Sequence, residues 1–405
     1  MLFRFKIEGL LLLNFFTITV AQAGTFKQIA ENLSQHVEVT QIEAKSKAMS
    51  EEASMASSWG DPRFQIAARN FPKDTLKNDT TPMTGIEFGL SQKIALSTKY
   101  GNIGDAQESM SQAVHYEAIN HSIELVKSLW ELAIMKRKAL EEKEILSENL
   151  DWITKILDVS KKRYGNGKIS QQAVLEIEIR KSEIESELSN KKYELSQISD
   201  QLNYLTGEGQ QLDFNTVPWS LLNKKDQERR DHRELAMKAK VTAKELSLTA
   251  AKQNYLPDLM VSVGYTKRSN IDGKGDFVGA SVSFPLPFSS EKYSQHGKAT
   301  EEKLMAQREY ENYELKKKRD LDVLHKEIEK IKAEIYLLES KTIKFARNSR
   351  TITSKSYGLG HSTYVELLQA ELKLQSILMK KTMLTAQRDS KLINLKYMNG
   401  ESLYE

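Results

Sequence analysis

The residue types that most often carry out chemistry are present in this 405-residue chain, but they are not grouped. His115 and His121, two of its seven histidines, are six positions apart, a spacing that does not place both on one face of a helix. There is no cysteine, which excludes thiolate metal ligands and disulfides. We find no nucleophile triad, no phosphate-binding glycine loop and no paired-carboxylate motif. We therefore expect neither an enzyme nor a bound cofactor or metal.

One short motif does recur, and it is built from tyrosine and glycine. RYGNGKIS at 163–170 returns as SYGLGHST at 356–363, an offset of 193 residues that also aligns LNYLTGE with LKYMNGE. Glycine supplies the left-handed backbone that ends a helix, and a following serine or threonine often caps the next helix. Each copy therefore predicts a turn between two antiparallel helices, tip 1 at 164–167 and tip 2 at 357–360. The residues concerned are Arg163, Tyr164, Gly165, Gly167 and Ser170 for tip 1, and Tyr357, Gly358, Gly360 and Thr363 for tip 2.

The tips follow long stretches without proline, a residue that costs about 3 kcal/mol or more inside a helix. The stretches from 105 to 163 and from 300 to 356 would each form a helix of about 85–90 Å at 1.5 Å per residue. After tip 1, apolar residues from Ile184 to Leu205 repeat with a heptad-like spacing that Lys191 interrupts. Helices of this length predict a rod or a tube.

Two proline-containing zones alternate apolar and polar residues with a period of two, which is typical of β-strands. The apolar series begin at Phe64, Ile86, Leu259 and Val278. They predict two hairpins, at 61–92 and 257–288, in which one face is apolar and the other small or polar. Such strands fit a membrane barrel or a half-buried soluble sheet. About eight strands are needed to close a barrel, so a trimer would supply twelve and a dimer eight.

The N-terminus has the form of a signal peptide. A basic start with Arg4 and Lys6 precedes an apolar run over residues 10–20, and Ala21-Gln22-Ala23 resembles a signal peptidase site. Residues 1–23 are therefore expected to direct export. The rest divides into a repeat at 24–207, a linker at 208–230 and a repeat at 231–405. Each repeat is expected to run helix, hairpin, long helix, tip, helix.

The charge is nearly balanced, with 59 basic and 55 acidic residues and a net charge of +4. Interspersed charge of this kind solvates long helices and does not form the basic surface that binds nucleic acid. We therefore expect no nucleic acid partner.

Taken together, the duplication, hairpins, tips and repeat ends resemble the TolC family of outer membrane efflux proteins of Gram-negative bacteria. The resemblance rests on DPRFQIAARNFP with GLSQKI, LPDLMVSVGY with FVGASVSFPLPF, and the two tips. The family fold implies an α+β membrane protein that forms a homotrimer. Each protomer would contribute four strands to a 12-stranded outer membrane β-barrel, continued in the periplasm by a long antiparallel α-helical barrel.

The resemblance also implies a function and its partners. Metal ions, drugs or other small molecules would pass from an inner-membrane pump, expected to be of the resistance–nodulation–division type, through a periplasmic adaptor that docks at the tips. In the family, acidic residues after the second tip ring the closed entrance. The matching positions here are Glu366 and Gln369, of which only the first is acidic, and their equivalents in the first repeat are Ala173 and Glu176. Glu366, Gln369 and Glu176 are the resulting candidates for lumen-facing gate residues.

Two other functions remain open at this point. A type I protein-secretion duct would share the fold and differ in its pump. A periplasmic coiled-coil structural or adaptor protein would never enter the outer membrane, but it would need one central hairpin flanked by compact β domains.

Overall fold

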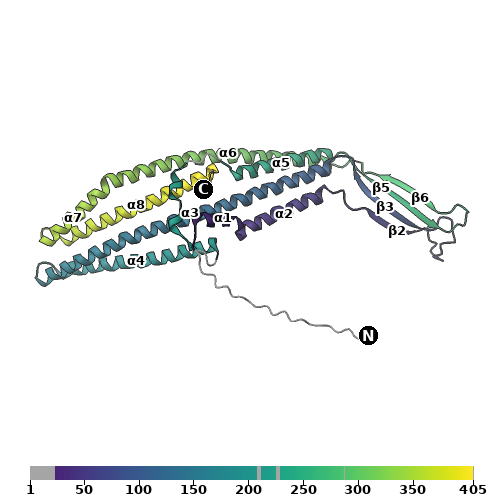
Figure 1. The fold of residues 1–405 in the computed structure, drawn as a ribbon. Helices are drawn as coiled ribbons and strands as arrows, with labels where there is room; N and C mark the ends of the chain where they lie inside the picture. Colours follow the sequence, from purple (N-terminus) through teal and green to yellow (C-terminus); the bar gives the residue numbers. More distant parts are fainter. Residues whose placement is uncertain (1–22, 208–210, 225–228, 287, 405) are drawn as a thin grey trace, which may run out of the picture.

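The computed structural model describes residues 23–207, 211–224, 229–286 and 288–404. Apart from Ala23, the expected signal peptide lies outside the described residues. The molecule is elongated, with a β-sheet at one end, two helical hairpins at the other and both described chain ends near the middle (Figure 1). Among the described residues, no helix combines the length and the apolar character needed to cross a bilayer.

Four antiparallel strands form the sheet, in the order β2-β3-β5-β6. The predicted hairpins are confirmed as β2 paired with β3 and β5 paired with β6, and pairing of β3 with β5 joins them. Strands β2 and β6 lie at the edges, each with one neighbour. The bounds are β2 Arg63–Arg69, β3 Gly85–Ala95, β5 Asp258–Arg268 and β6 Phe277–Ser283.

The register of the strands separates two kinds of side chain onto the two faces of the sheet. Phe64 lies opposite Leu90, Leu90 opposite Val263, and Val263 opposite Ala280, so an apolar row crosses all four strands. Because neighbouring residues of a strand point to opposite faces, the next row belongs to the other face. That row is polar and consists of Arg63, Ser91, Ser262 and Ser281.

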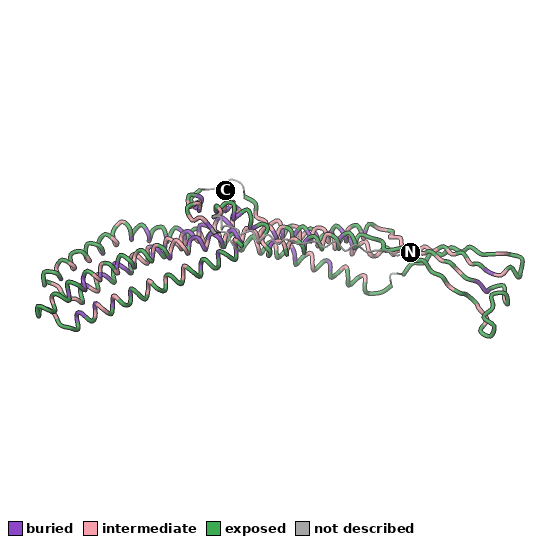
Figure 2. The backbone as a smooth tube through the Cα atoms, turned by 60° about the horizontal axis from the view of Figure 1, so that its bottom comes forward, coloured by how far each residue is buried: buried purple, intermediate pink, exposed green. Residues whose placement is uncertain are grey.

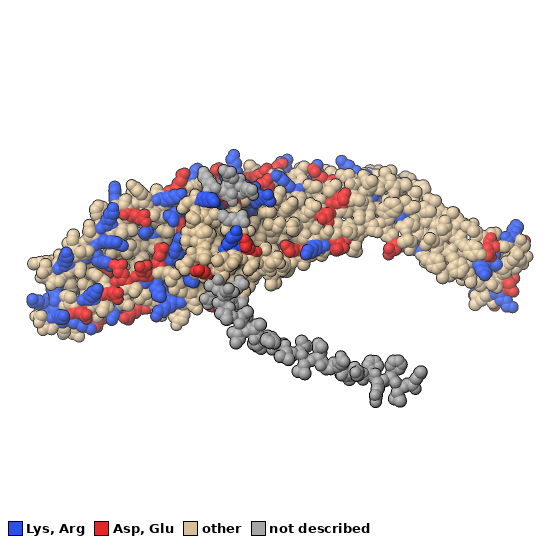
Figure 3. All heavy atoms as spheres, in the orientation of Figure 1, with Lys and Arg blue, Asp and Glu red and all other residues tan. Residues whose placement is uncertain are grey.

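The predicted division into an apolar and a polar face is therefore confirmed. In the view of Figure 3, charged side chains gather at the loop end of the sheet and few lie along the strands.

Long helices lead from the sheet to the tips. In the first half, α2 and α3 flank the first hairpin, and α3 runs for 67 residues to tip 1, where α4 returns. In the second half, α5 and α6 flank the second hairpin, and α7 and α8 meet at tip 2 (Figure 1). The bounds are α2 Val37–Ser57, α3 Lys99–Gly165, α4 Gln171–Thr206, α5 His232–Gln253, α6 Glu291–Leu337, α7 Ile343–Leu359 and α8 Tyr364–Asn399.

The predicted helix from 300 to 356 forms, but it is not α-helical throughout. A π-helical segment, Leu338–Thr342, separates α6 from α7. Its wider turns place one extra residue in the helix, and neither proline nor glycine marks the site in the sequence. Beyond it, α7 leans toward α8 (Figure 1).

The largest hydrophobic core lies in the middle of the molecule, where α1 (Phe26–Asn32) and the linker wrap the long helices. Phe26 and Trp130 are fully buried with ring centroids 4.9 Å apart, and Trp219 packs edge-on against Trp130 at 5.6 Å. The indole Nε1 of Trp130 donates to the carbonyl of Leu403 at 2.6 Å. Figure 2 shows buried residues concentrated along the helices and the strands mostly exposed. The remaining short elements are β1 Ala23–Gly24, paired with β4 Gln211–Leu212, and the 3-10 segments Leu33–Gln35, Phe214–Thr216 and Trp219–Asn223.

Gly400 closes α8 and generates a prediction about stability. Its φ is +71°, and an added Cβ would lie 2.7 Å from the carbonyl carbon of Arg230. Gly400→Ala should therefore cost about 1–2 kcal/mol for the left-handed backbone and more for displacing Arg230. Gly167→Ala is the matched control, because Gly167 has a φ of +68° and open space around it. The midpoint of thermal unfolding should fall further for Gly400→Ala, and equal shifts would contradict the steric argument.

Candidate functional site

Tip 1 is closed by its second glycine. The amide of Lys168 donates to the carbonyl of Arg163 at 2.9 Å, and the amide of Gly167 donates to Tyr164 at 2.8 Å. These two hydrogen bonds form a Schellman turn, and Gly167 takes the left-handed conformation with a φ of +68°. Gly165 is the last residue of α3 and keeps a negative φ. Only Gly167 therefore needs to be glycine for the turn.

Tip 2 repeats this turn at the equivalent residues. The amide of His361 donates to the carbonyl of Ser356 at 2.8 Å, and the amide of Gly360 donates to Tyr357 at 3.0 Å. Gly360 has a φ of +89°, whereas Gly358 lies within α7. The recurrence of Tyr-Gly-x-Gly thus reflects one backbone turn made twice.

The helices that leave the tips are capped as the sequence predicts. The hydroxyl of Ser170 accepts from the amide of Ala173 at 3.3 Å, and the hydroxyl of Thr363 accepts from the amide of Glu366 at 3.3 Å. The Glu366 carboxylate also accepts from the amide of Thr363 at 2.9 Å, which completes a capping box. Glu366 therefore has a local structural role that the sequence analysis did not assign to it.

The two tip tyrosines have different environments, although their sequence positions are equivalent. Tyr164 is 46% exposed, whereas Tyr357 is 1% exposed. The hydroxyl groups of Tyr357 and Ser160 are 2.8 Å apart, and the Arg163 guanidinium lies 4.7 Å from the Tyr357 ring and donates to the Tyr357 carbonyl. Tyr357 therefore packs tip 2 against tip 1, and its contact with an adaptor stays a prediction.

A buried polar cluster behind the tips was missed by the sequence analysis. Arg180 of α4 donates through Nε to Glu371 of α8 at 3.2 Å, and both side chains are buried. Arg180 also donates to Gln375, whose amide nitrogen donates to Glu187 at 2.9 Å. The cluster therefore links the two helical hairpins by hydrogen bonds across their interface.

The sequence does contain a signal for this cluster. Arg180 occupies a position three residues after the buried Ile177, on the apolar face of α4. Glu371 lies between the buried Leu367 and Leu374 on the apolar face of α8. A charge of opposite sign on the apolar face of each of two packed helices indicates a buried ion pair.

Glu371 is held in an environment that disfavours its charge. Burial raises the pKa of Glu371, while the hydrogen bond and charge of Arg180 act in the opposite direction. We take burial to dominate, because Oε1 of Glu371 is buried without a hydrogen-bond partner.

The proposed gate residues occupy the first turns after the tips. Glu366 and Gln369 are exposed on α8, and Glu176 is partly buried on α4. Within the described residues, His361 joins no metal-binding group, since no cluster of three His, Asp or Glu side chains is close enough to hold an ion.

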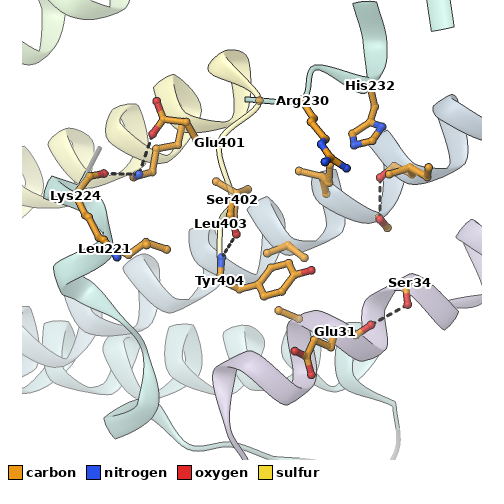
Figure 4. A pocket seen from close by; sticks show the side chains of 17 residues that line it. Glu31, Ser34, Leu221, Lys224, Arg230, His232, Glu401, Ser402, Leu403 and Tyr404 are labelled. Atoms are coloured by element: carbon orange, nitrogen blue, oxygen red, sulfur yellow. Dashed lines mark hydrogen bonds and ion pairs between the residues drawn. The ribbon is translucent and has the colours of Figure 1, made fainter. Parts of the chain in front are cut away.

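A pocket lies in the middle of the molecule, where the C-terminal segment crosses the helices (Figure 4). It encloses about 730 Å³ and is lined by Glu31, His232 and Tyr404, among others. The buried Lys396 ammonium in its wall already donates to the Glu401 carboxylate at 3.0 Å and to the Lys224 carbonyl at 2.6 Å. These contacts anchor the C-terminal segment, and we assign no ligand to the pocket.

The buried Glu371 predicts a pH-dependent stability. An acid whose pKa is raised by folding stabilises the protein below its unfolded pKa of about 4.3, and this stability is lost as pH rises through the folded pKa. As the pH rises from 4 to 8, the free energy of unfolding of the wild type should therefore fall relative to that of Glu371→Gln, by up to about 1.4 kcal/mol per pH unit. Glu178→Gln is the control, because Glu178 is the equivalent residue of the first repeat and pairs at the surface with Lys161 at 2.9 Å. If the difference in free energy of unfolding between wild type and Glu371→Gln does not vary with pH, the prediction is contradicted.

Comparison with known proteins supports the fold. No protein-family model and no curated protein matches the sequence. Among solved structures, the chain is similar to CusC, a protein that forms a transmembrane channel, with a TM-score of 0.78 and 13% identity over 95% of this chain and 94% of that chain. It is also similar to the outer membrane protein VceC of Vibrio cholerae, with a TM-score of 0.75 and 17% identity over 94% of this chain and 97% of that one. For the CmeC outer membrane channel of Campylobacter jejuni the TM-score is 0.73, with 13% identity over 93% and 85%. The predicted TolC-like fold of long helices and four antiparallel strands is therefore confirmed.

Proposed function

We propose that this chain is the outer membrane exit duct of a tripartite efflux system. The observation that carries the proposal is the fold shared with CusC, VceC and CmeC over more than nine-tenths of the chain. The duct would conduct metal ions, drugs or other small molecules passively from an inner-membrane pump, and the pump would supply the energy.

The strands support a location in the outer membrane. Phe64 is 65% exposed and Val278 is 81% exposed, both on the apolar face of the sheet. An exposed apolar surface of this kind marks contact with lipid or with another protein. In the proposed assembly this face contacts lipid, and the opposite face, with its serines and glycines, lines water.

The partners follow from the same arrangement. Edge strands β2 and β6 have unpaired backbone groups that a second copy would complete, and three copies give twelve strands. The helices would extend into the periplasm, where the tips meet an adaptor protein. The pump is proposed to be of the resistance–nodulation–division type. The division into repeats at 24–207 and 231–405 with a linker at 208–230 is part of this proposal, since both halves have the same order of elements.

Of the two alternative functions, the structure is compatible with a secretion duct but does not support a periplasmic rod or adaptor. A type I protein-secretion duct would differ only in its pump. A periplasmic rod or adaptor is not supported, because the two hairpins form one sheet at the end of the molecule and do not lie within compact β domains.

Two adjacent residues of β6 test the membrane location. Ala280 and Ser281 lie at the same depth on opposite faces of the sheet. Ala280→Arg places a charge against lipid, which costs about 2–4 kcal/mol near the middle of the bilayer. Ser281→Arg places the same charge in the water-lined interior, so it should permit insertion and change conductance.

The measurement combines outer membrane fractionation, gel migration with and without heating, and conductance in a planar bilayer. Wild type should appear in the outer membrane as a heat-dissociable oligomer that conducts. Equal insertion of both arginine variants would contradict the assignment of the faces. A soluble wild-type monomer without channel activity would overturn the proposed function.

We further propose that Glu366, Gln369 and Glu176 line the closed entrance near the tips. Three copies of Glu366 around a narrow axis would repel one another and attract cations. Glu366→Gln removes this charge but keeps the capping box, since glutamine serves equally well there. The current should rise, or its block by divalent cations should weaken.

Gln369→Glu, one turn further along α8, is the opposing control and should strengthen the block by divalent cations. Conductance and block that both variants leave unchanged would count against the gate.

A further inference from the structure

Tip 1 and tip 2 share a backbone but differ in charge. Tip 1 concentrates four basic residues within eight positions, whereas the equivalent positions of tip 2 hold one lysine and one histidine. Figure 3 shows Lys and Arg side chains gathered at the end of the α3–α4 hairpin. The 193-residue offset pairs Lys161 with Ser354, Lys162 with Lys355, Arg163 with Ser356 and Lys168 with His361.

Two of the four tip 1 charges are used within the chain. Arg163 contacts Tyr357, and Lys161 pairs with Glu178 at 2.9 Å. Lys162 and Lys168 are exposed, and neither forms an ion pair with a carboxylate of the described part of the chain. Two uncompensated positive charges therefore flank the turn.

The stability of the turn does not explain both charges. Lys162 lies in the last turn of α3, where the helix dipole favours a cation. Lys168 lies beyond the helix and just before Ser170, the N-cap of α4, where the dipole disfavours a cation. Tip 2 makes the same turn with Lys355 at the position of Lys162 but with His361 at the position of Lys168. The backbone fold therefore does not require Lys168.

We propose that tip 1 docks an acidic helical-hairpin surface of its periplasmic partner through Lys162 and Lys168. Tyr164 is exposed in the same turn and supplies apolar contact area to a protein partner. In tip 2 the equivalent Tyr357 is buried and packs the two helical hairpins against each other. The inference rests on the proposed function, because it specifies the charge of the adaptor surface that docks here. The lysine charges would speed the encounter with an acidic partner and disfavour basic ones.

The test uses the full-length protein purified in detergent and two synthetic helical hairpins as probes. The hairpins are identical except that the four positions around the turn are glutamate in one and lysine in the other. At low salt the glutamate hairpin should bind at least about fivefold more tightly than the lysine hairpin, and the difference should shrink at high salt. Lys162→Glu/Lys168→Glu should reverse the preference.

Lys143→Glu/Lys192→Glu is the matched control, because it changes the net charge equally at exposed residues of α3 and α4 away from the tip. It should keep the wild-type preference. Equal binding of both hairpins to the wild type would overturn the inference, and so would equally tight binding of polyglutamate, which would show charge attraction without recognition of a hairpin.

Conductance of the same wild-type preparation separates this inference from the proposed function. A conducting protein that does not distinguish the hairpins contradicts the inference alone. A protein that distinguishes them but does not conduct contradicts the duct and supports an acidic-surface binding site at tip 1.

Discussion

The unpaired backbone groups along the two edges of the sheet are the constraint on which the rest of the structure depends. Strands β2 and β6 each have a neighbour on one side only, and the face they share with β3 and β5 is apolar. In lipid each unpaired N–H or C=O group costs several kilocalories per mole, so such a sheet is stable there only when other strands complete it. Pairing of β3 with β5 matters for this reason, because it makes the two hairpins one four-stranded unit with a single apolar face.

The opposite end of the molecule is held by different forces. The glycine-closed turns fix where the helices reverse, but the helical hairpins meet partly through polar groups. Arg180, Glu371 and Gln375 are buried together, and Ser160 contacts Tyr357. A buried ion pair contributes little net stability, because desolvation offsets its attraction, but it penalises any packing that separates the partners. The cluster therefore specifies how α4 and α8 align more than it strengthens their contact.

Local patterns in the sequence predicted the strands, the tip turns and their caps, because each depends on residues close together in the chain. Gly167 and Gly360 have positive φ, and Ser170 and Thr363 cap the helices that follow. The π-helical segment Leu338–Thr342 was not predictable, since its residues are ordinary helix formers. The partner of Glu371 and the different burial of the two tip tyrosines depend on contacts between α3, α4, α7 and α8, which periodicity within one helix does not contain.

The two tips show how one backbone turn can serve two purposes. The turn requires glycine at one position and a capping hydroxyl three residues later, and both tips meet this requirement. It places no demand on the side chains that point away from it. In tip 2 these positions hold the buried Tyr357, which fills the interface between the hairpins. In tip 1 they hold the exposed Tyr164 and Lys168, and Lys168 pairs with no carboxylate in the described part of the chain, which is why the proposed docking is assigned to tip 1.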